Sequence, residues 1–202
     1  MKINVKKNGV CLFILAVGLL CSVSFLKAES QTPDAPTNCV YNPSFEEGSR
    51  DIPSGWEQWT LQGNAEFLWD GNVAHSGKRS VRISNSTGMA GWLTTADYLI
   101  PVDLAKKYIV IGWIKTDGVN PEHSACLIVA WFDQSKKYIS VSAVSPGWIV
   151  GTKDWTQVSL TVVPPYGKPV AYAQVGCRMD FVGVAGGTAW FDDLEFKISE
   201  VE

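Results

Sequence analysis

Short runs of β-branched and aromatic residues follow one another along the chain, and no helical period lasts beyond a turn or two. The runs are rich in Val, Ile, Tyr, Phe and Trp, and Gly, Pro, Asn and Asp separate them, which is typical of antiparallel β-sandwiches and barrels. The pattern therefore predicts an all-β fold. The expected strands are 64–70, 79–84, 89–95, 107–116, 125–133, 156–163, 169–179 and 188–198.

The period of two along a strand predicts which side chains share a face. In 169–179 the polar and aromatic face holds Tyr172, Gln174 and Arg178, and the opposite face is apolar and predicted to be core. The core residues expected from this strand are Ala171, Ala173, Val175, Cys177 and Met179. In 188–198 the same count puts Asp192 on one face with Leu194 and Phe196, so Asp192 is expected to face the interior.

The first 28 residues have the order of a secretory signal peptide: early lysines, an apolar run over 10–20, and small or polar residues up to Ala28. An apolar run of about eleven residues is too short for a bilayer core, which needs about twenty, so no membrane span is expected. Residues 29–38 are polar with two prolines and are predicted to be a tether. Residues 39–202 are long enough for one domain, expected to be monomeric and secreted or at the cell surface.

Removal of residues 1–28 takes away four lysines and no acids, which leaves 13 basic against 20 acidic residues and a net charge of −7. An acidic surface argues against nucleic acid and against anionic polymers in general. The remaining cysteines are Cys39, Cys126 and Cys177, an odd number, so at most one internal disulfide can form. Two alternatives therefore remain for Cys126 and Cys177: a disulfide between them, or buried free thiols.

The chain offers no positive sequence evidence for catalysis. It has two histidines, His75 in a His-Ser-Gly-Lys turn and His123 in a loop after Pro121, and neither lies beside a nucleophile elbow or a metal-ligand helix. A carboxylate pair for glycoside hydrolysis leaves no signature in sequence. A small polysaccharide lyase or hydrolase therefore stays as a third alternative.

Two acids, Glu46 and Asp192, are candidates for a metal site. A buried carboxylate is costly unless it is paired or bound to a cation, and no lysine or arginine is an obvious partner for Asp192. In a jelly roll the chain ends lie side by side, which would bring 42–46 close to 191–193. Carboxylates and backbone carbonyls together suit Ca²⁺. The alternative is that Asp192 accepts backbone N–H bonds in a turn or bulge.

Nine tryptophans in one domain exceed what a single core of this size usually needs, so exposed rings are expected. Trp131 alternates against Ile128, Ala130 and Phe132 and is predicted to look outward, and Trp92 is a candidate for the same surface. Such rings stack on the C–H faces of sugars, while planar polar groups bond the hydroxyls. Buried packing is the alternative for each ring. The tryptophans taken as structural are Trp56, Trp113, Trp155 and Trp190.

Six motifs occur in an order that resembles the carbohydrate-binding modules of families four, nine and twenty-two, over about residues 40–198. They are Asn42-Pro43-Ser44-Phe45-Glu46-Glu47-Gly48, Pro53-x-Gly55-Trp56, His75-Ser76-Gly77-Lys78-Arg79-Ser80, Tyr108-x5-Ile114-Lys115-Thr116, Gly151-Thr152-x-Asp154-Trp155 and Gly187-Thr188-Ala189-Trp190-Phe191-Asp192-Asp193-Leu194.

The resemblance implies a jelly-roll β-sandwich of two antiparallel sheets that binds a polysaccharide or oligosaccharide on its concave face, without catalysis. It implies a structural Ca²⁺ held by Glu46, the Lys78 backbone and Asp192. It also implies groove positions at Trp92, Tyr172, Gln174 and Arg178. The alternative function is a structural or adhesive domain that binds a protein or a cell-envelope partner.

Overall fold

The computed structural model describes residues 37–61, 63–120, 123–181 and 186–199. Residues 1–33 and 34–202 separate into two units, and the second unit contains all of the described residues. The predicted signal peptide and nearly all of the predicted tether therefore lie outside the described residues. Within the described ranges, no helix has the length and apolar character needed to cross a membrane.

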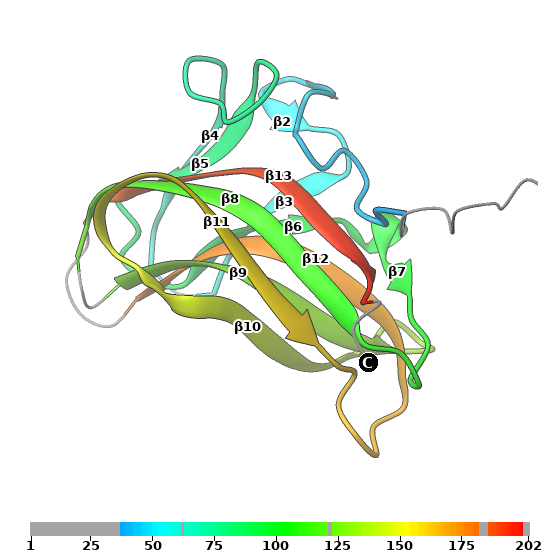
Figure 1. Ribbon diagram of the computed structural model, residues 1–202. Coiled ribbons are helices and arrows are strands. Elements are labelled where there is room, and N and C mark those ends of the chain that lie inside the picture. Colours follow the sequence, from blue (N-terminus) through cyan, green and yellow to red (C-terminus); the bar gives the residue numbers. More distant parts are fainter. Residues whose placement is uncertain (1–36, 62, 121–122, 182–185, 200–202) are drawn as a thin grey trace, which may run out of the picture. The chain divides into compact units, whose positions relative to one another are not determined.

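Two antiparallel sheets face each other and form the sandwich (Figure 1). The six-stranded sheet runs β10 (Tyr138–Ile149), β9 (His123–Asp133), β12 (Val170–Phe181), β6 (Ala90–Thr94) and β3 (Trp56–Thr60), and β7 (Ile100–Pro101) also pairs with β12. The five-stranded sheet runs β11 (Gly151–Val162), β8 (Tyr108–Val119), β13 (Thr188–Ile198), β5 (Ser80–Ser84) and β4 (Glu66–Asp70). The small pair β1 (Gly48–Ser49) and β2 (Ile52–Pro53) and the 3-10 turn η1 (Ala96–Tyr98) complete the elements.

The predicted all-β sandwich of antiparallel sheets is confirmed, and each of the eight expected strands overlaps an observed one. The two longer strands that the sequence did not predict are β3 and β10, which lie at the two edges of the six-stranded sheet. An edge strand is less buried than a central one, so it needs no continuous apolar run. Glu57 and Gln58 in β3 and the serines of β10 break such a run.

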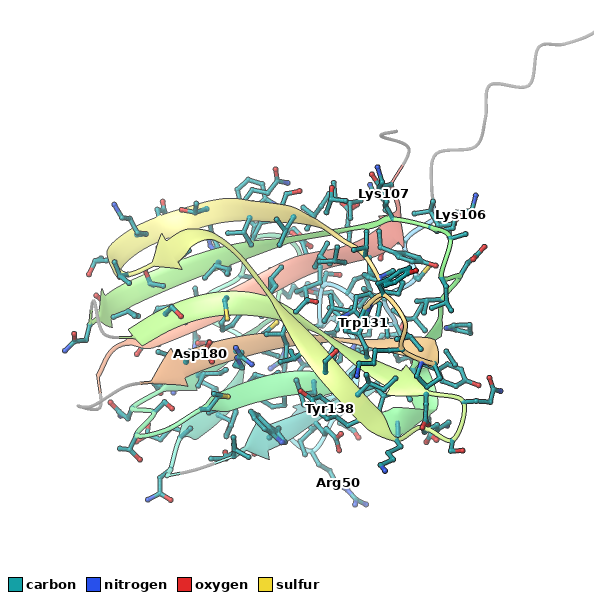
Figure 2. All side chains as sticks on the ribbon, turned by 90° about the horizontal axis from the view of Figure 1, so that it is seen from below. Arg50, Lys106, Lys107, Trp131, Tyr138 and Asp180 are labelled. Carbon is teal, nitrogen blue, oxygen red and sulfur yellow. The ribbon has the colours of Figure 1, made fainter. Side chains whose placement is uncertain are left out.

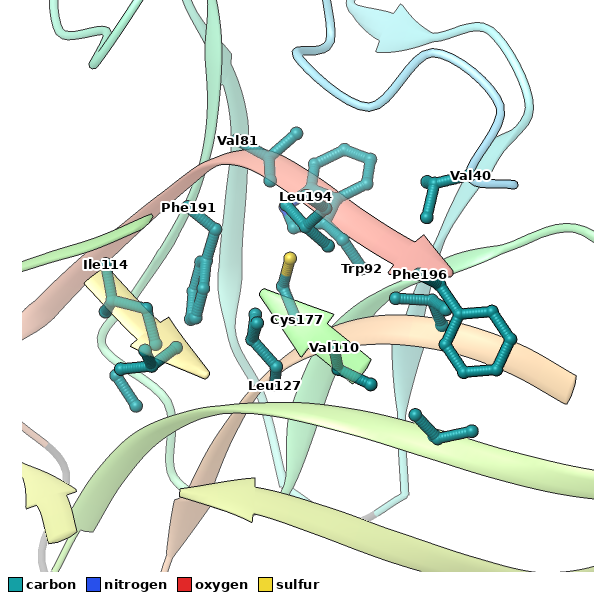
Figure 3. Close-up of a cluster of buried hydrophobic side chains, with 14 of the residues drawn as sticks. Val40, Val81, Trp92, Val110, Ile114, Leu127, Cys177, Phe191, Leu194 and Phe196 are labelled. Atoms are coloured by element: carbon teal, nitrogen blue, oxygen red, sulfur yellow. The ribbon is translucent and has the colours of Figure 1, made fainter. Parts of the chain in front are cut away.

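The core lies between the sheets and takes large side chains from both (Figure 3). Phe191, Leu194 and Phe196 come from β13, and Trp92 and Leu127 face them from the six-stranded sheet. All five are fully buried. The predicted inward face of β12 is confirmed, since four of its members are fully buried in this cluster: Ala173, Val175, Cys177 and Met179.

Trp92 and Trp131 belong to the core, so the prediction that these rings look out from the sheet is wrong. Both are fully buried, and Trp131 shares the inward face of β9 with Leu127 and Val129. Each indole N–H finds a partner: Trp131 Nε1 donates to Ser142 Oγ at 3.0 Å, and Trp92 Nε1 donates to the Arg82 carbonyl at 3.1 Å. A buried indole is stable when its polar atom is bonded in this way.

A β-bulge interrupts β13 between Asp192 and Glu195 and reverses the alternation that the sequence predicted. Asp193 adopts a left-handed conformation with φ 48°. Phe191 lies inward before the bulge and Leu194 lies inward after it, so Asp192 faces out of the sandwich, opposite Trp113 on β8. The expectation that Asp192 faces the interior is therefore wrong, although its side chain is fully buried under the loop that follows β4.

Truncation of a core ring tests this assignment. We expect Trp92→Ala to lower the free energy of unfolding by about 3–5 kcal/mol, because it removes a large buried side chain and leaves a cavity. Leu61→Ala is the control, since Leu61 is 65% exposed and its loss should change stability by about 0.5 kcal/mol or less. Urea unfolding followed by fluorescence measures both. A loss below about 1 kcal/mol for Trp92→Ala would contradict the buried placement.

Candidate functional site

The outer face of the six-stranded sheet carries the polar and aromatic residues predicted for β12. Directly opposite residues of antiparallel strands share a face, so the register identifies their neighbours. Trp59 on β3, Gly91 on β6 and Arg178 on β12 form one row. Gly91 has no side chain, so nothing from β6 stands between the Trp59 ring and the Arg178 side chain. Cys126 on β9 continues the row beyond Arg178.

A second row lies at the other end of the same face. Tyr172 pairs with Phe132 on β9, and Phe132 pairs with Tyr138 on β10. The Phe132 and Tyr138 rings meet edge to face with centroids 6.0 Å apart, and Tyr138 is 55% exposed. Six residues of β12 separate Tyr172 from Arg178, which corresponds to about 20 Å at about 3.4 Å per residue. The face thus offers aromatic surface at both ends.

The middle of the outer face is apolar and closely covered. Leu93 and Ile128 lie so near Gly176 that a β-carbon there would collide with Leu93. Ile128 and Ala130 point to this face, yet they are only 4% and 6% exposed. The exposed surface of this face is therefore largest at Tyr138, while at the other end Trp59 is half-buried and Arg178 and Cys126 are buried.

Arg178 and Asp180 form an ion pair on the outer face. Arg178 Nη2 donates to Asp180 Oδ2 at 2.6 Å. Nε also lies 2.5 Å from Oδ1, but that N–H is not aligned with the oxygen, so this approach is ionic and not a hydrogen bond. Arg178 Nε, Asp180 Oδ1 and the hydroxyl of Ser124, which lies opposite Asp180, are buried without a hydrogen-bond partner among the described residues. All three atoms are shielded from solvent, so only the more exposed part of the Asp180 side chain is open to a ligand.

The predicted set of site residues is only partly brought together. Tyr172, Gln174 and Arg178 share the outer face, whereas Trp92 and Trp131 lie in the core. Gln174 is 8% exposed and its Nε2 donates to the Thr94 carbonyl, so it mainly supports the sheet.

Sequence reasoning missed Trp59, Tyr138 and Asp180. The first two belong to the edge strands that were not predicted. Asp180 has the same parity as Arg178, and extending the alternation by one step would have found it.

Cys126 and Cys177 lie on adjacent strands but point to opposite faces of the sheet, so the disulfide left open by the sequence does not form. Cys126 faces outward and its Sγ lies 4.0 Å from Asp180 Oδ2, while Cys177 is in the core. Burial, followed by the nearby Asp180 carboxylate, raises the pKa of the Cys126 thiol to about 12. Cys39 is the exposed thiol.

The loop 73–79 meets the two acids that the sequence proposed for a metal site. Glu46 Oε1 accepts N–H bonds from Lys78 at 2.7 Å and Arg79 at 2.9 Å. Asp192 Oδ2 accepts bonds from the backbone N–H groups of His75 at 2.8 Å and Ser76 at 3.2 Å. The predicted proximity of the chain ends is confirmed, because Leu194 N–H donates to the Pro43 carbonyl.

The alternative expected for Asp192 is confirmed, because its carboxylate accepts N–H bonds from His75, Ser76 and Asp193 at the bulge. Asp192 is fully buried, and no lysine or arginine lies within ion-pair distance of it in the described part of the chain. Burial, followed by the Asp193 carboxylate, raises the pKa of Asp192 to about 7, against the lowering effect of its N–H bonds. No three acidic, histidine or cysteine side chains of the described residues converge here, so an ion would also need carbonyl ligands.

His75 is built into the same corner. Its ring stacks on Trp113 with centroids 3.9 Å apart, and Nδ1 lies 2.6 Å from Asp193 Oδ2. Trp155 approaches the same ring edge to face at 5.6 Å. These contacts fit the expected turn position of His75 and the expected structural role of Trp113 and Trp155. The side chain of His123 lies outside the described residues.

The structure is a two-sheet antiparallel β-sandwich with aromatic rings and polar groups on one outer sheet face. The chain belongs to the carbohydrate binding domain family CBM 4/9, whose model matches residues 37–173. The family resemblance stated from the motifs is thereby confirmed.

Solved structures show the same fold at low identity. The CBM22-1 xylan-binding domain of Paenibacillus barcinonensis Xyn10C is 15% identical, with a TM-score of 0.59 over 83% of this chain and 98% of that one. The arabinose-bound α-L-arabinofuranosidase MgGH51 is 18% identical over 80% of this chain, with a TM-score of 0.59. Tailspike protein 4 of bacteriophage CBA120 is 16% identical over 80% of this chain, with a TM-score of 0.55.

The chain spans only 26% of the arabinofuranosidase and 21% of the tailspike domain, so the similarity is to one part of those proteins. Among proteins with curated descriptions, none matches the sequence.

The cysteine geometry predicts a simple labelling pattern. In native protein that begins at residue 29, we expect a thiol reagent to modify Cys39 rapidly and to spare Cys126 and Cys177, because both are buried. All three should react in urea. Counting labels by mass spectrometry measures this. A mass lower by two hydrogens, or a rapid second label in the native state, would contradict the assignment.

Proposed function

We propose that this protein binds a polysaccharide or oligosaccharide on the outer face of the six-stranded sheet, without chemical conversion. The observation that carries the proposal is the combination of Trp59, Tyr172 and Tyr138 with the Arg178–Asp180 ion pair on one face. Family membership supports carbohydrate as the ligand class. A location outside the cytoplasm, secreted or at the cell surface, is part of the same proposal.

The physical basis is stacking of sugar rings on the aromatic side chains. If two rings each lose about 100 Å² to a sugar, the apolar gain is about 5 kcal/mol at about 25 cal/mol/Å². Association costs remove part of this gain, so affinities between millimolar and micromolar are expected. Hydroxyls of the sugar would bond the Arg178–Asp180 pair at Asp180, whose side chain is 19% exposed.

The ion pair also bears on the charge of the ligand. Asp180 neutralises Arg178, so the polar part of the face has no net positive charge for a uronic acid. Neutral sugars are therefore the class expected at the Arg178 end of the face. The similar fold of a xylan-binding domain makes xylan the first polymer to test.

Affinity electrophoresis and calorimetry on a panel of neutral plant and microbial polysaccharides test the proposal. Trp59→Ala and Tyr172→Ala should each weaken binding about tenfold or more, since each removes one stacking ring. Tyr166→Ser is the control because Tyr166 is fully exposed on the loop between β11 and β12, away from the outer face.

If both ring variants bind glycan as well as the unmodified protein does, the outer face is not the binding site. Absence of binding across a broad panel would favour the alternative of a structural or adhesive domain with a protein or cell-envelope partner.

We also propose a structural Ca²⁺ held by Glu46, the Lys78 carbonyl and Asp192. Support comes from the buried, cation-free Asp192 carboxylate and from the convergence of Glu46 on the same loop. A bound cation would hold Asp192 ionised where burial alone raises its pKa.

Thermal unfolding with Ca²⁺ or chelator tests the ion. Ligands must be ionised, and Asp192 has a pKa of about 7, so Ca²⁺ should raise Tm more at about pH 8 than at about pH 5. At a hundredfold excess over Kd the gain is about 2.7 kcal/mol, or roughly 5–10 °C in Tm. Glu46→Gln should abolish the shift and the exposed control Asp154→Ala should keep it. An equal shift at both pH values, or one retained in Glu46→Gln, would refute the site.

A further inference from the structure

One end of the sandwich collects exposed lysines on an otherwise acidic chain. This basic end consists of three loops: 102–107 between β7 and β8, 134–137 between β9 and β10, and 163–169 between β11 and β12. The register brings the loops together, because Tyr108 pairs with Val162 and Val170 pairs with Asp133. The lysines are Lys106, Lys107, Lys136, Lys137 and Lys168, and all five are exposed.

These positive charges are not neutralised locally. No lysine of the basic end takes part in an ion pair within the described ranges. The aspartates closest in sequence are engaged with backbone groups: Asp103 Oδ1 accepts the Ala105 N–H, and Asp133 Oδ1 accepts the N–H groups of Ser135 and Lys137. Lys136 Nζ donates to the Ala96 carbonyl, beside the exposed Asp97. The N–H bonds leave these carboxylates charged, so five lysines against Asp97, Asp103 and Asp133 leave a net charge of +2 on the described residues of the basic end.

Large apolar side chains are exposed among the lysines. Tyr166 has 103% of its reference surface exposed, so no other part of the domain touches its ring. Leu104 is 57% exposed and Val163 is 55% exposed, in the neighbouring loops. Ile198, at the end of β13 opposite Tyr108, is 44% exposed. An exposed apolar group at a loop tip contributes nothing to folding and needs a partner to be buried.

The basic end is separate from the Arg178 end of the outer face. Figure 2 shows Lys106 and Lys107 at one end of the strands and Asp180 at the other. The loop between β11 and β12 extends past the strand ends in Figure 1. The chain also enters the domain close to this end, because Cys39 N–H donates to the Phe196 carbonyl.

We infer that the basic end is a docking surface for an anionic phospholipid membrane. Lysines near an anionic bilayer gain electrostatic attraction, while Tyr, Leu and Val side chains enter the boundary between headgroups and acyl chains. Both chemistries occur here on adjacent loops. A soluble polyanion would use the lysines but would leave Tyr166 and Leu104 in water, so a bilayer fits the surface better. The inference does not rest on glycan binding, although the basic end adjoins the Tyr138 and Tyr172 end of the outer face.

Vesicle flotation tests the inference on the full chain purified after secretion. The probe is phosphatidylcholine vesicles with and without phosphatidylglycerol at low salt. The protein should float only with the anionic vesicles, and salt should weaken the interaction. Lys106→Gln/Lys107→Gln should weaken partitioning roughly 25-fold, at about fivefold per lysine. Tyr166→Ser should also reduce partitioning to the anionic vesicles, because the ring enters the boundary region.

Controls separate this surface from net charge and from glycan binding. Arg50→Gln/Lys153→Gln removes the same charge outside the basic end, and Leu61→Ser removes an exposed apolar group elsewhere; both should bind vesicles normally. Trp59→Ala should do so as well.

Three results would overturn the inference. One is an equal loss in both charge variants, or no flotation at all. Another is an affinity for the soluble acidic polymer polygalacturonate that equals the affinity for vesicles and is unchanged in Tyr166→Ser. The last is lipid-independent self-association in sedimentation that Tyr166→Ser abolishes.

Discussion

The left-handed conformation of Asp193 allows β13 to contribute side chains both to the core and to the contact with the loop 73–79. By adding one residue to β13, the bulge lets Phe191, Leu194 and Phe196 all fill the core while Asp192 turns outward to the loop 73–79. Asp192 then fixes that loop through the N–H groups of His75 and Ser76. Without the bulge, either the carboxylate would enter the core or the apolar residues would leave it, and both changes are costly.

The aromatic residues on the two faces of the six-stranded sheet differ in burial. Indoles at inward positions of central strands are buried and bonded, as in Trp92 and Trp131, and they hold the sheets together. Rings on the edge strands, Trp59 and Tyr138, keep exposed surface because no further strand covers them. Tyr172 and the Arg178–Asp180 pair connect these edges through the central strand β12. Substitutions on the edge strands can therefore change the outer face of the sheet without altering the core.

Much of the fold followed from local pattern, whereas the site did so only in part. Central strands such as β8 and β12 carry apolar runs that burial on at least one face requires, so their position and the inward face of β12 were predictable. The outer residues Tyr172 and Arg178 came from the same alternation. Three features were not predictable from the sequence: the bulge at Asp193, the face on which Trp131 lies, and the edge strands. They depend on neighbours distant in sequence. The corner of Glu46, Lys78 and Asp192 was found through motif order, which encodes such distant contacts.

The central place of β13 has a consequence for how the chain matures. This last strand lies between β8 and β5, and Asn38 at the start of the domain bonds to Leu194 and Phe196 within it. The five-stranded sheet therefore stays divided into two separate strand pairs, β11 with β8 and β5 with β4, until β13 is available to join them. Such non-local pairing slows folding. Closure of the sandwich therefore requires both ends of the segment 38–198, and a break anywhere between β4 and β13 would separate strands that the fold needs together.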